Sequence, residues 1–228
     1  MTEDECRQML SRFSHEVRNP VTLINSFLQL LVREHPEIAT YSFYEKIIEN
    51  MNLLTGLLDE MSRFNNAARL QKEPTDLSAF LRDIADSGAV MLASYGISVS
   101  CRCPEKLPEI SLDQSKFLQV LYNLIRNAAE AMPDGGHILI RASRSSGETR
   151  IEVENDGPAI PKEYLPDLFQ PFITHKKNGT GLGLAICQEI ITAHGGTITV
   201  SSSEGSTIFT IILPDACKPH ADRRQNTF

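Results

Sequence analysis

Residues 10–31 read LSRFSHEVRNPVTLINSFLQLL, and their apolar side chains recur at the spacing of one long helix. The recurring positions, separated alternately by three and four residues, are Leu10, Phe13, Val17, Pro20, Ile24, Phe27 and Leu31. This alternation is typical of the seam of a coiled coil or helical bundle, and it is narrower than the stripe of a helix that packs on a sheet. The stretch therefore predicts a bundle helix.

A second seam with the same spacing follows, at Tyr44, Ile47, Met51, Leu54, Leu58 and Met61. His35-Pro36 predicts the end of the first helix, with residues 35–42 as a turn. We therefore expect residues 1–68 to form an antiparallel helical hairpin. Because two helices alone cannot cover both seams, a homodimer that forms a four-helix bundle is the economical arrangement.

The rest of the chain predicts a second domain of the α+β class at residues 77–216, after a linker at 69–76. The predicted elements are a helix at 77–95, a strand at 97–103, a helix at 113–132 capped by Asp113, strands at 137–144 and 149–155, a loop at 156–180, a helix ending at His194, and strands at 197–203 and 206–213. The segregation of helices from strands favours one mixed sheet with helices on one face. Residues 217–228 are predicted to be a polar tail.

Composition excludes several classes of protein. The chain has 228 residues, of which 41% are hydrophobic and 22% charged, as in an ordinary globular protein. A formal net charge of −7 argues against a general nucleic-acid binder. The stretch at 21–32 is too short and too polar to span a bilayer, and the five cysteines form no CxxC pair. We expect a cytoplasmic chain, either independent or the cytoplasmic part of a larger membrane receptor.

The first candidate site is the segment FSHEVRNP at 13–20. His15 falls off the seam and should face solvent, with Glu16 next to it to accept a proton from the imidazole. Asn19 lies one turn further on the same face, and Pro20 should bend the helix just beyond the histidine. A solvated surface histidine is the plainer alternative. A zinc site of the HExxH type is excluded, since the second histidine is missing.

Two further segments indicate phosphate and metal chemistry. Asn123 and Asn127 are four residues apart on one helix, so their carboxamide oxygens share a face that could ligate Mg²⁺. GTGLGLAI at 179–186 opens a helix with glycines that allow backbone N–H groups to approach a phosphate. The alternatives are a solvated helix face and a plain turn. The segment lacks the GxxxxGK[ST] pattern of a Walker loop, and no βαβ unit surrounds it as a dinucleotide-binding fingerprint would require.

Taken in order, the segments FSHEVRNP, NLIRNAAEAM, NDGPAIP, LFQPF and GTGLGLAI resemble the H, N, G1, F and G2 boxes of bacterial two-component sensor histidine kinases. The resemblance covers residues 10–214. Within the family, the sequences HEVRNP and NLIRNAAEAM are similar to those of the nitrogen-regulatory and sporulation kinase branches. It implies a dimerisation and histidine phosphotransfer hairpin, followed by an α/β-sandwich ATP-binding domain of the gyrase/Hsp90/histidine kinase/MutL type.

The resemblance also implies roles for individual residues. His15 is the expected phosphoacceptor, Glu16 its general base, and Asn19 the residue that orients water during dephosphorylation of the regulator. Asn127 is the expected Mg²⁺ ligand, and Phe169 and Phe172 are expected to anchor the 156–180 lid on the core. The residues expected to bind ATP are Asn123, Arg126, Asn127, Asn155, Gly157, Ile160, Phe172, Lys176, Gly179, Thr180, Gly181, Leu182, Gly183 and Thr207.

Three positions depart from the family pattern. Asn155 stands where the family usually has an aspartate that accepts a hydrogen bond from the adenine amino group. Asp156 follows it and, on a strand, would point to the opposite face. Ala159 replaces the second glycine of that box. Some members carry lysine at the position of Glu130, so the phosphate charge would be met by Arg126 or Lys176.

We expect an ATP-dependent protein-histidine kinase that phosphorylates His15 and passes the phosphoryl group to an aspartate of a response regulator, which it would also dephosphorylate. The regulator should dock against the hairpin. One alternative is a histidine phosphotransferase or pseudokinase whose ATP domain is vestigial. Another is an ATP-gated chaperone or topoisomerase fragment, although those families lack a hairpin that bears HExxN.

Overall fold

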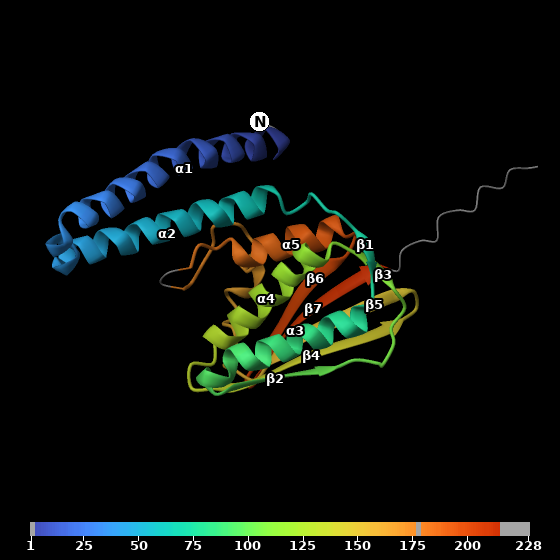
Figure 1. The fold of residues 1–228 in the computed structure, drawn as a ribbon. Coiled ribbons are helices and arrows are strands. Elements are labelled where there is room, and N and C mark those ends of the chain that lie inside the picture. Colours follow the sequence, from blue (N-terminus) through green and yellow to red (C-terminus); the bar gives the residue numbers. More distant parts are fainter. Residues whose placement is uncertain (1–2, 177–178, 215–228) are drawn as a thin grey trace, which may run out of the picture. The chain divides into compact units, whose positions relative to one another are not determined.

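The computed structural model describes residues 3–176 and 179–214, with side chains given for Ser14 and from Glu16 onward (Figure 1). The chain divides into two compact units, which are described separately below. Of the described residues, those within 1–68 and 169–186 form the first unit, and those within 69–168 and 187–228 form the second. In the described ranges, no helix is long and apolar enough to cross a membrane.

The first unit contains the predicted helical hairpin. Helix α1 (Glu3–Glu34) runs through Pro20, a 3-10 turn η1 (Pro36–Thr40) follows, and helix α2 (Ser42–Asn65) returns alongside α1. Proline is tolerated in the turn because it sits at the start of η1, where its missing N–H is not needed. The helices are tied by Arg18, whose guanidinium donates to Asp59 Oδ1 at 2.5 Å and to Leu58 O at 3.2 Å.

Much of the apolar surface of the hairpin remains exposed in the single chain. Among seam positions, Ile24 is 46% exposed, Phe27 59% and Ile47 45%, whereas Leu58 is only 4% exposed. Further exposed apolar side chains of the hairpin are Leu23, Leu30, Leu31, Phe43, Leu53 and Leu57. The second helix therefore covers only part of the seam, as the sequence predicts for a single hairpin.

The second unit is built on a five-stranded sheet with the strand order β2-β4-β5-β7-β6. Strand β2 (Ile97–Arg102) pairs in parallel with β4 (Gly136–Ser145), and the remaining neighbours are antiparallel: β5 (Glu148–Asn155), β7 (Ser206–Pro214) and β6 (Thr197–Ser203). A separate two-stranded ladder joins β1 (Glu73–Thr75) to β3 (Ile110–Leu112). The ladder was not expected, and β1 lies within the segment predicted as a linker.

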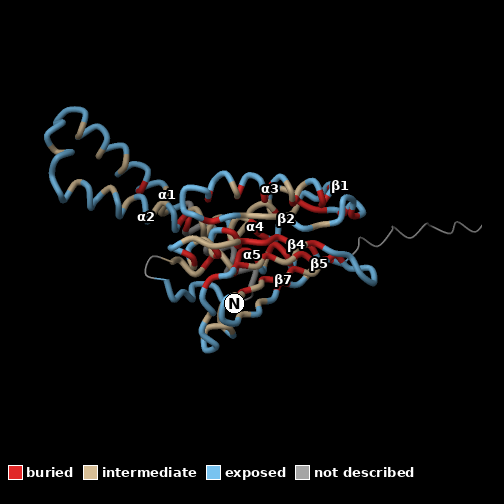
Figure 2. Tube along the Cα trace, turned by 90° about the horizontal axis from the view of Figure 1, so that it is seen from below, coloured by how far each residue is buried: buried red, intermediate tan, exposed pale blue. Residues whose placement is uncertain are grey.

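Helices cover one face of the five-stranded sheet (Figure 1). They are α3 (Leu77–Leu92), followed by η2 (Ala93–Tyr95), then α4 (Gln114–Glu130), and α5 (Gly183–Ala193), which belongs to this unit from Cys187 on. A short turn η3 (Leu165–Asp167) precedes the loop that leads to α5. Figure 2 shows that buried residues concentrate where the helices meet the sheet. The predicted mixed sheet with helices on one face is confirmed.

Apolar residues of α4 and of the central strands form the core of this unit. Phe117, Leu121 and Leu124 of α4 are fully buried, as are Ile140 of β4 and Ile151 of β5. The apolar side chains of the strands alternate with polar ones, because successive side chains point to opposite faces of a sheet. Burial of the apolar face of α4 leaves its polar residues on the remaining surface.

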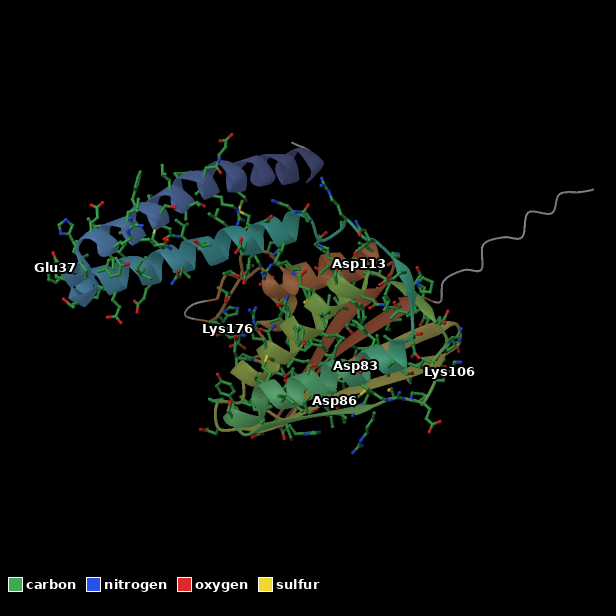
Figure 3. All side chains as sticks on the ribbon, viewed as in Figure 1. Glu37, Asp83, Asp86, Lys106, Asp113 and Lys176 are labelled. Carbon is green, nitrogen blue, oxygen red and sulfur yellow. The ribbon has the colours of Figure 1, made fainter. Side chains whose placement is uncertain are left out.

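Asp113 caps α4, as predicted, and also holds two other parts of the unit (Figure 3). Its carboxylate accepts hydrogen bonds from Lys116 N at 3.0 Å, Ser115 Oγ at 2.7 Å and Gln71 N at 2.8 Å. Partial burial of Asp113 would raise its pKa, but these hydrogen bonds hold the pKa below its ordinary value. The backbone N–H of Asp113 donates to Nε2 of His194 at 3.0 Å.

His194 is held as a neutral imidazole. Its Nε2 accepts from Asp113 N, so the proton is on Nδ1, which donates to Ile190 O at 2.8 Å. Burial lowers the pKa of His194 and outweighs the hydrogen bond to Ile190, which raises it; the charge of Lys72 lowers the pKa and that of Asp113 raises it, both by less. A protonated Nε2 could not accept the Asp113 hydrogen bond.

This arrangement predicts a dependence of stability on pH. Because the folded-state pKa of His194 lies below its ordinary value of 6.5, its contribution is complete above pH 6.5 and is lost as the pH falls through the lowered pKa. Urea unfolding should show that stability declines more steeply between about pH 7.5 and about pH 5.5 in the wild type than in His194→Leu. That variant should lose about 1–3 kcal/mol at the higher pH, because it leaves the Asp113 N–H unpaired. Parallel pH profiles would contradict the role of His194.

Candidate functional site

Helix α4 presents three polar side chains beside its buried apolar face. Asn123 donates from Nδ2 to Cys187 Sγ at 3.7 Å, while its Oδ1 lies 3.5 Å from the Arg126 guanidinium. Burial raises the pKa of Cys187 to about 12, so this sulfur stays a neutral thiol and can accept from the amide. Asn127, one turn beyond Asn123, is half-buried on the same side of the helix.

The cationic group on this face is only loosely held. Arg126 Nε lies 3.8 Å from Glu130 Oε1, and both side chains are about half exposed. An exposed pair at this distance contributes little stability, so the guanidinium can exchange its partner at low cost. The face can therefore offer amide oxygens to a hard cation and a guanidinium to an anion.

Four of the predicted site residues are brought together at one end of β5. Asn155 ends the strand and pairs in register with Thr207 of β7, and both are 3% exposed. Ser202 of β6 joins this group: its hydroxyl lies 2.6 Å from Thr207 Oγ1 and accepts from Ile160 N at 2.9 Å. Gly157 follows two residues after Asn155. We call Asn155, Gly157, Ile160 and Thr207 the β5 cluster.

Gly157 is required to be glycine by the close approach of two side chains. A Cβ added there would lie 2.8 Å from Met132 Cγ and 2.9 Å from Asn155 Nδ2, both closer than real Cβ contacts. The backbone at Gly157 can therefore approach these side chains only because it carries none itself. Within the described part of the chain, no group accepts a hydrogen bond from the buried Nδ2 of Asn155.

Asp156 has a different position from its neighbour, as predicted. Its side chain is exposed, and its Oδ1 accepts a hydrogen bond from the backbone N–H of His137 at 2.8 Å. The carboxylate thus fastens the start of β4 to the end of β5. It does not belong to the β5 cluster, and a shift of register that exchanged Asn155 and Asp156 would break this bond.

The glycine-rich loop belongs to the first unit. Gly181 has φ +71°, and its carbonyl accepts from Phe172 N at 3.1 Å, while Leu182 N donates to Thr180 Oγ1 at 3.2 Å. Gly179 N donates to Lys176 O at 3.1 Å, and residues 177 and 178 lie outside the described residues. Helix α5 then begins at Gly183. Glycine, a tight turn and a helix start in succession are typical of anion-binding backbone.

Phe172 does not have the predicted role of anchoring the lid on a core. Phe172 is 56% exposed, whereas Phe169 is half-buried. Its contribution is made by the backbone, which adopts φ +66° and donates to Gly181 O. An aromatic side chain in a loop suggested a buried anchor, but the left-handed backbone at this residue turns the chain instead.

The phosphoacceptor candidate lies on α1. His15 is in the helix, and its side chain lies outside the described side chains. Glu16 and Asn19 are exposed on the same helix. The ion pair between Arg18 and Asp59 was not found by sequence reasoning, since no local pattern signals a bond across 41 residues. It fixes α1 against α2 within one turn of His15.

Comparison with known families identifies two matching models. The His Kinase A (phospho-acceptor) domain matches residues 6–69, and the histidine kinase-, DNA gyrase B- and HSP90-like ATPase matches residues 112–216. Among curated proteins, the sensory histidine kinase/phosphatase NtrB of Rhizobium meliloti is 32% identical over 224 residues, which cover 90% of this chain and 58% of NtrB. Sporulation kinase C of Bacillus subtilis is 28% identical, and the match covers 91% of this chain and 48% of that kinase. The chain thus spans about half the length of these relatives.

Solved structures show the same similarity. Full-length ShkA in complex with AMPPNP has a TM-score of 0.76 and 26% identity, covering 92% of this chain and 46% of ShkA. The catalytic domain of histidine kinase ThkA has a TM-score of 0.59 and 31% identity, covering 64% of this chain and 97% of that domain. ThkA in complex with the response regulator protein TrrA has a TM-score of 0.64 and 27% identity, and the match covers 91% of this chain and 61% of the ThkA chain.

The geometry of Gly181 generates a prediction about the loop. An added Cβ would meet Phe172 C and Ile173 N at 2.6 Å, in addition to the cost of about 1–2 kcal/mol for a left-handed alanine. Gly205 is the matched control, because it has φ +72° but no atom within 4 Å of an added Cβ. Gly181→Ala should therefore lower the free energy of unfolding in urea by more than Gly205→Ala does. Equal losses would contradict the prediction and show that the loop shifts to relieve the close contacts around Gly181.

Proposed function

The chain belongs to the sensor histidine kinase family, and we propose that it uses ATP to phosphorylate its own His15 and then passes the phosphoryl group to an aspartate of a response regulator. The proposal is carried by the presence, in one chain, of a helix bearing HExxN and of the second unit, which we call the ATPase unit. This unit contains the β5 cluster and the polar α4 face formed by Asn123, Arg126 and Asn127. The family resemblance expected from the sequence is confirmed.

We assign the nucleotide base to the β5 cluster. The fit rests on two features: the buried Nδ2 of Asn155, which has no hydrogen-bond partner among the described residues, and a glycine whose missing side chain allows close approach. The phosphates are assigned to the glycine-rich loop, where backbone N–H groups at the start of a helix favour anions. We assign the neutralisation of phosphate charge to Arg126 or Lys176.

Asn127 would hold Mg²⁺, with Asn123 beside it. The described residues contain no group of three or more His, Cys, Asp or Glu that could hold a metal ion. A single amide oxygen fits Mg²⁺ that keeps water and phosphate oxygens as its other ligands. When bound, the ion neutralises charge on the phosphate oxygens, and the protein supplies its position.

At the phosphoacceptor, an imidazole nitrogen of His15 forms the new bond to the γ-phosphorus, and ADP leaves with the electrons of the broken bond. Glu16 accepts the proton from the other imidazole nitrogen, as its exposed position next to His15 allows. Arg18, paired with Asp59, keeps this stretch of α1 against α2 during the reaction. Residues 1–68 thus act as the phosphotransfer hairpin and residues 77–216 as the ATP-binding domain, joined by residues 69–76.

The regulator is proposed to dock on the hairpin, where the phosphoryl group passes from His15 to its aspartate. The similarity to ThkA, whose structure is with the response regulator protein TrrA, supports this partner. The similarity to NtrB, named a kinase/phosphatase, supports a second activity in which Asn19 orients water for dephosphorylation of the regulator. Asn19 is exposed and one helical turn from His15, as this role requires.

The proposed active form is a homodimer. Exposed apolar side chains on both helices of the hairpin, such as Phe27 and Ile47, would be covered by the same helices of a second copy. A self-complementary four-helix core buries both seams, whereas the single hairpin leaves them in contact with water.

A second candidate is a histidine phosphotransferase or pseudokinase that relays phosphate through His15 without using ATP. The replacement of the usual aspartate by Asn155 favours it, because a neutral amide accepts a weaker hydrogen bond than a carboxylate. Calorimetry with Mg-ATP separates the two candidates, since only the kinase requires nucleotide binding.

The kinase assignment predicts acid-labile, base-stable labelling of the chain by Mg-ATP. His15→Gln should abolish the label, because glutamine has no nucleophilic imidazole. His35→Gln is the matched control: it removes an exposed histidine that directly follows the same helix and should retain full labelling. Undiminished label in His15→Gln would refute the assignment of the phosphoacceptor.

Mixed dimers test both the dimer and the order of events within it. A His15→Gln chain keeps a working ATP domain, and an Asn127→Ala chain keeps the acceptor but loses the proposed Mg²⁺ ligand. Phosphorylation in trans should restore label on the Asn127→Ala chain of the mixed dimer alone, whereas phosphorylation in cis should leave both chains unlabelled while cross-linking still shows mixed dimers. A strictly monomeric protein at micromolar concentration, with both helices intact, would contradict the dimer.

A further inference from the structure

The buried amide of Asn155 is the feature of the β5 cluster that the proposed function does not fully use. Its side chain is 3% exposed, yet among the described residues nothing accepts a hydrogen bond from Nδ2. Buried donors without a partner are uncommon because they lose their hydrogen bonds to water. An unpaired donor inside a candidate binding site therefore indicates a ligand that would accept its hydrogen bond.

The neighbouring carboxylate is not available for the same task. Asp156 is exposed and its Oδ1 is bonded to His137 N at 2.8 Å, where it fastens β4 to β5. Asn155, by contrast, is held in register between Ile138 and Thr207. The group that faces the ligand in this cluster is thus an amide, which offers both a donor and an acceptor.

This difference changes which bases the site can recognise. A carboxylate only accepts hydrogen bonds, so it pairs with the 6-amino group of adenine and repels the 6-oxo group of hypoxanthine or guanine. An amide pairs with either, because a half-turn of its terminal torsion exchanges Oδ1 and Nδ2. The side chain needs no larger space for this exchange, since the two atoms are similar in size.

We propose that Asn155 determines the base specificity of this chain and that it accepts 6-oxopurine nucleoside triphosphates as well as ATP. The inference rests on the proposed nucleotide site and adds to it a second class of substrate. Inosine triphosphate is the best probe, because its base differs from adenine at the 6-position and at the adjacent N1 proton, and it lacks the 2-amino group of guanine.

Calorimetry on the full chain should compare Mg-ATP with Mg-ITP in the wild type, Asn155→Asp, Asp156→Asn and the double variant. The wild type should bind the two nucleotides within about tenfold of each other, as expected when each base makes one hydrogen bond to the same amide. Asn155→Asp should raise the preference for ATP by at least about tenfold, because its acceptor-only carboxylate faces the 6-oxo group. The ratio of ATP to ITP affinities in the wild type tests the inference even where a variant fails to fold.

The control exchanges the same two residue types at the next position. Asp156→Asn keeps an oxygen that can accept from His137 N, so the preference for ATP over ITP should stay as in the wild type. The double variant should behave as Asn155→Asp. Labelling of His15 with γ-labelled ITP should follow the binding results.

Three results would overturn the inference. A wild type that binds ATP more than about tenfold more tightly than ITP would show that the amide does not accept both bases. An unchanged preference in Asn155→Asp would show that Asn155 is only structural. In both cases ATP still binds and labels His15, so the proposed kinase stands. Absence of binding by either nucleotide would instead remove the inference and the proposed function together.

Discussion

The start of α4 is held at one point by Asp113, and the position of the polar α4 face depends on it. The carboxylate ties together the first turn of the helix and the backbone of Gln71, while the N–H of Asp113 reaches His194 at the end of α5. These bonds fix where α4 begins, and burial of Phe117 and Leu121 fixes its rotation. Asn123 and Asn127 then project from the side that the core leaves open.

A second constraint acts at the edge between β4 and β5. The bond from His137 N to Asp156 joins the beginning of one strand to the end of the other, so Asn155 is the last paired residue of β5. Gly157 then allows the chain to pass close to Met132 and to the Asn155 amide. The Nδ2 of Asn155 is buried at this end of the sheet without a partner among the described residues, and the proposed base assignment rests on that feature.

The hairpin follows a different physical rule. Its two helices share an ion pair between Arg18 and Asp59, but the seams remain partly exposed, with Phe27 59% and Ile24 46% accessible. The ATPase unit buries its own core, whereas the hairpin needs another surface to bury its apolar side chains. The proposed dimer supplies that surface, and it places two copies of His15 in one assembly.

The sequence by itself determined the two-helix hairpin, the Asp113 cap, the strands of the large sheet and the family, because each depends on local periodicity or on short motifs. It also predicted that Asn155 and Asp156 would point differently, since side chains alternate at a strand. The sequence did not predict the ladder of β1 and β3, because three-residue strands, one of them containing Pro74, carry no recognisable pattern. Only the tertiary structure decided the exposure of Phe172, the pairing of Arg18 with Asp59, and the joint burial of Asn155 and Thr207. Those features depend on contacts between residues far apart in the chain, and such contacts are set by packing and hydrogen bonding in the folded molecule rather than by neighbours in the sequence.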